Sequence, residues 1–133
     1  VLHPQMEPVL ADDLNDHVMV LRLSYGEVSV LLTSDLNREG QMAMLEKGYH
    51  PLASVMQIPQ HATLLALDGE FLAQVQPQVA LIQIDRANRR GDPDDDTLSN
   101  LGDIPVFRTD EIGDIHLWTD GQSLWIAGEN ELQ

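Results

Sequence analysis

The chain has 133 residues, and its 22 acidic and 7 basic side chains give a net charge of −15, so binding to nucleic acid by this chain alone is not expected. Cysteine is absent, which excludes disulfides, thiolate catalysis and thiolate zinc sites. No apolar run approaches the roughly 20 residues of a membrane-spanning helix, and no leader pattern opens the chain, so we expect one soluble domain over residues 1–133.

Two short strands begin the predicted fold. Residues 1–16 are rich in Pro and Asp and are expected to form a loop, whereas residues 18–23 are apolar and β-branched enough for a strand. Gly26 supplies the permissive backbone of a tight turn. Residues 28–33 then complete an antiparallel hairpin.

Helices and strands alternate after this hairpin. Residues 37–47 carry apolar side chains at helical spacing and are followed by Gly48, a favourable helix end. A short buried strand is predicted at residues 55–58, a short helix at residues 70–75 and another strand at residues 78–84.

The last third of the chain predicts one helix and three strands. The helix should begin with Asp92 as its N-cap and Pro93 in the first helical position, and it should end near Gly102. The three strands are expected at residues 105–108, 114–119 and 123–127. The tail, residues 128–133, is expected to be loop-like. This order predicts the α/β class, with a mixed β-sheet flanked by helices.

The first two strands are apolar on both alternating faces, which indicates that both faces of the sheet are covered. The three predicted helices are short and can cover one face. We therefore expect the other face to meet a second sheet, from elsewhere in the same fold or from a second copy of the chain, and in the second case the chain forms a homo-oligomer.

Four motifs follow one another along the chain: Thr33-Ser34-Asp35, Ile58-Pro59-Gln60-His61-Ala62-Thr63, Gly91-Asp92-Pro93 and the stretch of residues 104–113. Their order resembles that of the ComEC family of competence proteins. Thr33-Ser34-Asp35 follows the hairpin where that family has Thr-Gly-Asp, and residues 58–63 are similar to its Val-Pro-His-His-Gly-Ser. Gly91-Asp92-Pro93 stands where the family has Gly-His-Pro, and residues 104–113 resemble its Pro-Val-Tyr-Arg-Thr-Asp-Glu-Xaa-Gly stretch. The resemblance covers roughly residues 15–126.

The resemblance implies the second half of a metallo-β-lactamase-like domain, a four-layered αββα sandwich built from two αβ halves. The His-Xaa-His-Xaa-Asp-His motif of the family's first half has no match in this sequence. The missing N-terminal half-domain is therefore an expected partner. The implied context is DNA uptake by a longer, membrane-anchored bacterial protein, in which this domain acts as a phosphodiesterase or nuclease.

Three residues fall on metal-ligand positions of the family. Asp35 matches the bridging aspartate, His61 is the remaining histidine of the His-His pair, and Asp92 replaces a histidine. Zinc or manganese would be the metal if the site functions, and no cofactor is expected otherwise. Each residue also has an ordinary interpretation: a loop aspartate, a hydrogen-bonded histidine and a helix cap.

Several replacements weaken this metal site. Gln60 takes the place of the first histidine, and an amide is a poor ligand for zinc or manganese. Ser34 replaces the glycine that lets the first loop turn closely. Ala62 replaces another glycine, so the backbone there is expected not to reach the family's position. Asp92, Asp94, Asp96 and Asp103 have calcium-loop spacing, but Thr97 occupies the place of the obligatory glycine.

Two further features have stronger structural than functional interpretations. The basic stretch Asn88–Gly91 could contact a phosphate, but a solvated loop is favoured. Trp118 and Trp125 flank a predicted hairpin turn, where cross-strand packing accounts for both.

Three hypotheses follow. The first is a ComEC-like segment with an incomplete metal site that is inactive alone. The second is a metal-dependent hydrolase completed by a missing N-terminal half, and the third is a protein-interaction module.

Overall fold

The computed structural model describes residue 2 and residues 18–129. Nearly all of the predicted opening loop, residues 1–16, and the end of the predicted tail, residues 130–133, lie outside these described residues. Within them, no helix combines the length and apolar character needed to cross a bilayer.

A five-stranded mixed sheet forms the centre of the molecule, in the order β1-β2-β3-β4-β5. β1 and β2 form the predicted antiparallel hairpin, and the neighbours from β2 to β5 are parallel. The strands of this sheet are β1 (Leu21–Tyr25), β2 (Val28–Leu32), β3 (Val55–Gln57), β4 (Val79–Ile82) and β5 (Val106–Arg108). The mixed sheet and its flanking helices confirm the α/β class.

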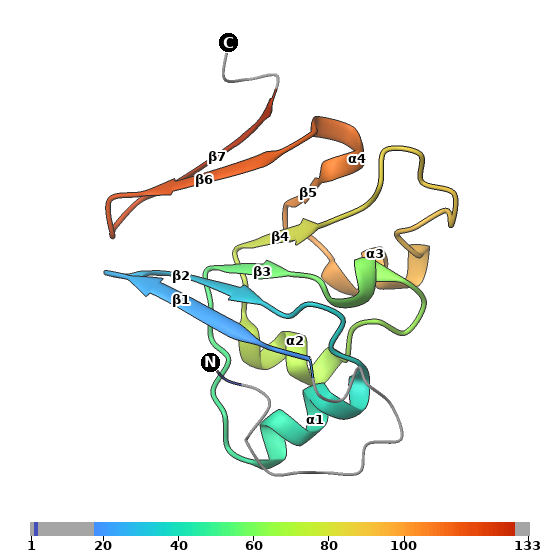
Figure 1. Ribbon diagram of the computed structural model, residues 1–133. Helices are drawn as coiled ribbons and strands as arrows, with labels where there is room; N and C mark the ends of the chain where they lie inside the picture. The colour runs from blue at the N-terminus through green and yellow to red at the C-terminus, as the bar shows by residue number, and fades with distance from the viewer. Residues whose placement is uncertain (1, 3–17, 130–133) are drawn as a thin grey trace.

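Two helices cover one face of this sheet. α1 (Arg38–Glu46) and α2 (Gly69–Val75) lie side by side beneath the strands in Figure 1. The core between helices and sheet includes Phe71 from α2, Met44 from α1 and Leu31 from β2, all fully buried. This packing accounts for the helical spacing of apolar side chains that the sequence shows in both segments.

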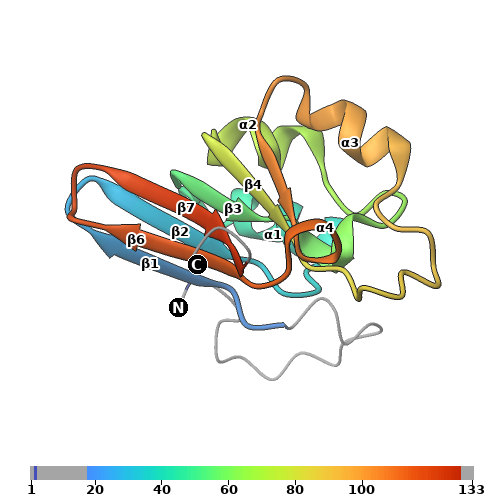
Figure 2. The same cartoon turned by 90° about the horizontal axis from the view of Figure 1, so that it is seen from above.

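The opposite face is covered in part by the chain's own last hairpin. β6 (Ile115–Thr119) and β7 (Leu124–Gly128) form a separate two-stranded antiparallel sheet that lies over β1 and β2 (Figures 1 and 2). The two hairpin tips touch, because the backbone N–H of Glu27 donates to Gly121 O over 2.6 Å. Gly26 is required there, since it has a φ of +59° and a Cβ would collide with the Gly121 backbone.

Most predicted elements occur within a few residues of their expected bounds, and three details differ. The third helix, α3 (Asp95–Leu101), begins later than expected, with Asp94 and not Asp92 as N-cap. Gly128 belongs to β7 and not to the loop-like tail. Two short helices were not predicted, the 3₁₀ helix η2 (Pro59–Ala62) and α4 (Thr109–Ile112).

Candidate functional site

The candidate metal ligands lie at the carboxyl edge of the parallel strands, where successive strand ends bring their loops together. The loop after β2 carries Asp35, η2 follows β3 and carries His61, and the loop after β4 carries Asp92. Two backbone hydrogen bonds tie these segments together. Gln60 N donates to Ser34 O over 3.2 Å, and Asp94 N donates to Ala62 O over 2.8 Å.

His61 and Asp35 are neighbours at this edge. The His61 Nδ1 atom lies 2.7 Å from the backbone oxygen of Gln83, and because a carbonyl only accepts, this nitrogen carries a proton. His61 Nε2 lies 3.8 Å from Asp35 Oδ1. In the neutral ring Nε2 is then the nitrogen with a free lone pair, the tautomer found in many metal-ligating histidines. The two side chains are 46% and 52% exposed, so the pair itself contributes little stability.

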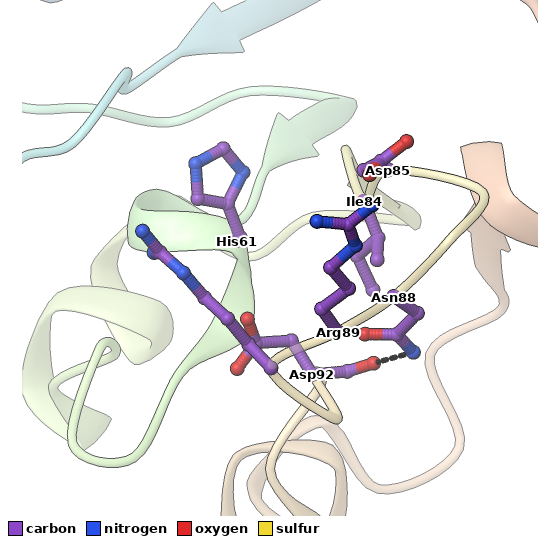
Figure 3. A pocket seen from close by; sticks show the side chains of 7 residues that line it. His61, Ile84, Asp85, Asn88, Arg89 and Asp92 are labelled. Atoms are coloured by element: carbon purple, nitrogen blue, oxygen red, sulfur yellow. Dashed lines mark hydrogen bonds between the residues drawn. The ribbon is translucent and has the colours of Figure 1, made fainter.

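Asp92 lies across a pocket from His61. Both residues line a cavity of about 340 Å³ together with residues of the β4–α3 loop (Figure 3). The backbone oxygen of Asp92 accepts a 2.6 Å hydrogen bond from Asn88 Nδ2. The predicted capping role of Asp92 is wrong, because the Asp94 carboxylate accepts the N–H of Asp96 at the start of α3.

The donor set at this edge is small. Among residues 18–129 there is no group of three or more His, Cys, Asp or Glu side chains placed to hold a metal ion. Asp35 and His61 offer two adjacent donors, fewer than the three or more protein ligands of a hydrolytic site. These described residues alone therefore do not fit a zinc or manganese ion.

The loops at this edge hold a strained backbone. Ser34, Gln60, His61 and Ala62 have φ values of +52°, +49°, +56° and +59°, in the left-handed region. This conformation costs a residue other than glycine about 1–2 kcal/mol. Ser34 and Ala62 replace glycines of the family motifs, yet both keep the backbone conformation that glycine favours.

Two glutamines brace the loops and were not singled out by the sequence. Gln57 Oε1 accepts the backbone N–H of Ser34 over 3.3 Å. Gln57 Nε2 donates to Gln83 Oε1 over 2.8 Å. Position alone could have found them, because Gln57 is the last residue of β3 and Gln83 directly follows β4, at the points where these strands turn into site loops.

The motif at residues 104–113 is hydrogen-bonded to the segment after β4, next to the candidate site. Thr109 Oγ1 accepts from Ile84 N and donates to Ile84 O, both over 2.8 Å, and so joins the segment after β4 to the first residue of α4. Arg108 pairs with Asp110 over 2.7 Å. The hydrogen bond from Arg108 lowers the pKa of the Asp110 carboxyl, and the same bond raises the pKa of Arg108. This part of the motif is structural, since its hydrogen bonds fix the start of α4.

Comparison with known proteins supports the family that the motifs predicted. The chain is 32% identical over 103 residues to ComE operon protein 3 of Bacillus subtilis (strain 168). The chain is similar to one segment of that protein. The match takes in 76% of this chain but 13% of the ComEC relative. No family model matches the chain, and no solved structure matches it.

Proposed function

We propose that this chain is the second αβ half of a metallo-β-lactamase-like unit in a ComEC-type protein, and that alone it is not a metal-dependent hydrolase. Its biological context is then competence and DNA uptake, as the family resemblance implies. A hydrolytic ion must be held by several ligands while one coordination position stays open for water. The proposal is supported most directly by the donor set, in which Asp35 and His61 lie 3.8 Å apart as a pair.

A test of catalysis uses the purified chain with manganese or zinc and the generic phosphodiester bis(p-nitrophenyl) phosphate. We expect no turnover above that of the metal ions alone. The Asp35→Ala and His61→Ala variants are the matched controls, since a contaminating enzyme would be unaffected by either change. Metal-dependent cleavage that disappears in both variants would refute the inactive assignment.

In the proposed unit, the second layer packs on an apolar surface of this chain. We name as the open apolar face the side chains that β1, β2 and the β6–β7 hairpin turn toward one another. Its members are Leu23, Tyr25, Val30, Leu32, Leu117 and Leu124. They line an apolar groove of about 400 Å³.

The open apolar face is only partly covered. Leu23 is 57% exposed and Tyr25 is 63% exposed, although both belong to the sheet. β1 is also an edge strand of the sheet, a position where exposed apolar residues favour pairing with another chain. We propose that a missing N-terminal half covers this face in the longer protein, and that a second copy covers it in the isolated chain.

A second candidate function is a divergent phosphodiesterase that the N-terminal half completes. One observation favours it specifically: Ser34 and Ala62 keep left-handed backbone conformations that bring the Asp35 and His61 loops together. Such strain persists only where the surrounding structure imposes it, and it gathers at functional sites. Joining the chain to a first half that carries the His-Xaa-His-Xaa-Asp-His motif distinguishes the two functions, because only the second predicts metal-dependent cleavage by the joined protein.

A further inference from the structure

We infer that the loop between β4 and α3 forms a phosphate-binding site, in which Arg89 and Arg90 bind a phosphate group inside the pocket lined by His61. This inference is independent of the proposed function, because it requires neither a metal ion nor a second half. It concerns the cavity of about 340 Å³ in Figure 3. That volume is within the range of small-ligand sites.

The distribution of basic side chains is the first observation. All seven Lys and Arg residues of the chain lie within residues 18–129. Three arginines have partners in the protein: Arg22 donates to Leu52 O, Arg38 pairs with Asp68, and Arg108 pairs with Asp110. These guanidinium groups are used by the fold itself.

The remaining arginines are gathered in one loop. Arg86, Arg89 and Arg90 make no hydrogen bond or ion pair with the described part of the chain. Arg89 and Arg90 line the pocket, whereas Arg86 does not. In a chain with a net charge of −15, two guanidinium groups beside one cavity are donors that lack an acceptor among the residues that the structure describes.

Hydrogen bonds hold the backbone of the loop that carries these arginines. Asn88 N donates to Asp85 O over 2.7 Å, and Gly91 N donates to Asn88 O over 3.2 Å. The Asn88 side chain closes the loop through its hydrogen bond to Asp92 O, which Figure 3 shows as a dashed line. A preorganised loop loses less conformational entropy when a ligand binds.

The charges in the pocket define the kind of recognition. Asp85 and Asp92 line the same cavity, so it has no excess of positive charge. Neither carboxylate forms an ion pair with Arg89 or Arg90. Binding must therefore come from directed hydrogen bonds and not from net potential. The planar guanidinium fork matches the oxygens of a phosphate group and can donate two parallel hydrogen bonds to it.

The test is a titration of the full chain, freed of metal with EDTA, with inorganic phosphate and with phenyl phosphate. Amide and guanidinium resonances are followed by NMR at constant ionic strength, and phenol is the ligand control without phosphate. We expect saturable shifts in the β4–α3 loop with both phosphate probes and none with phenol.

Four variants locate the site. Arg89→Ala and Arg90→Ala should each weaken phosphate binding by about tenfold, the effect of losing a charged hydrogen bond. Arg86→Ala removes the same charge from the same loop outside the pocket and should change binding by less than about twofold. Arg89→Lys should recover only part of the affinity, because lysine keeps the charge and loses the fork.

The inference is overturned by shifts that do not saturate, or by an equal loss of affinity in Arg86→Ala and Arg89→Ala. Full recovery in Arg89→Lys would also overturn it, because charge alone would then account for binding. Each variant's fold is checked by circular dichroism, which is expected to stay unchanged since all three arginines are exposed.

Discussion

Replacing Ser34 with glycine tests whether the strained backbone at the candidate site is real. Ser34 is exposed, and its φ of +52° lies in the left-handed region. Its backbone makes both site contacts, accepting from Gln60 N and donating to Gln57 Oε1. The substitution therefore relieves strain without removing either of these backbone contacts.

The expected increase in the free energy of unfolding of Ser34→Gly is the difference between two contributions. Relief of the left-handed conformation favours the Ser34→Gly fold by about 1–2 kcal/mol. Glycine also gives the unfolded chain more freedom, which opposes folding by about 0.5–1 kcal/mol. The net stabilisation is about 0.5–1 kcal/mol, or an increase in Tm of roughly 2–4 °C for a chain of this size.

Urea denaturation followed by circular dichroism measures this change in the free energy of unfolding. Ser34→Ala is the matched control, because it removes the hydroxyl and keeps the left-handed strain, so its stability should stay near that of the unchanged chain. If Ser34→Gly is no more stable than Ser34→Ala, the backbone is not strained there and the argument for an imposed loop geometry is refuted.

Three further predictions concern the scaffold. Gln41 is fully buried, donates to Leu36 O and Ala66 O and accepts from Asp68 N, so Gln41→Met should lower the free energy of unfolding by about 2–4 kcal/mol in urea denaturation. A hydrogen bond from Arg38 lowers the pKa of Asp68 below 3.8, so this carboxylate stabilises the fold above that pH and its contribution is lost as the pH falls through the folded pKa. Asp68→Asn should cost about 1 kcal/mol at neutral pH and flatten the loss of stability below about pH 4, and equal slopes in both proteins would contradict this. Gly26→Ala should cost about 1 kcal/mol or more and speed hydrogen exchange in β6 and β7, because a Cβ there collides with the Gly121 backbone.

The sequence predicts the elements of this fold well because their signals are local. The β1–β2 hairpin follows from apolar strands around Gly26, and α1 follows from apolar spacing that ends at Gly48. The start of α3 was placed too early because Asp92-Pro93 resembles a helix start. The competing cap, Asp94, is also held by a hydrogen bond from its N–H to Ala62, a contact distant in sequence.

The arrangement of the loops is harder to predict from the sequence. The proximity of Asp35 and His61 could be inferred from the sequence, because both follow predicted strand ends and both belong to the ordered motifs. The structure agrees with that inference. No local rule predicts left-handed conformations at Gln60, His61 and Ala62, because none of these residues is glycine.

The second sheet was expected from elsewhere in the same fold or from a second copy of the chain, and part of it is this chain's own β6–β7 hairpin. Its position depends on long-range contacts, such as the one between Glu27 and Gly121 at the two hairpin tips. The basic loop was expected to be solvated, and its place beside His61 depends on the path of the whole β4–α3 connection.

Sedimentation velocity of the isolated chain over a range of concentrations tests most directly whether the open apolar face binds a second layer of protein. The account predicts concentration-dependent association that Leu23→Asp abolishes. Leu64→Asp, which changes a leucine outside this face that is 60% exposed, should leave association unchanged. A single monomeric species at every concentration, or equal effects of the two substitutions, would contradict it.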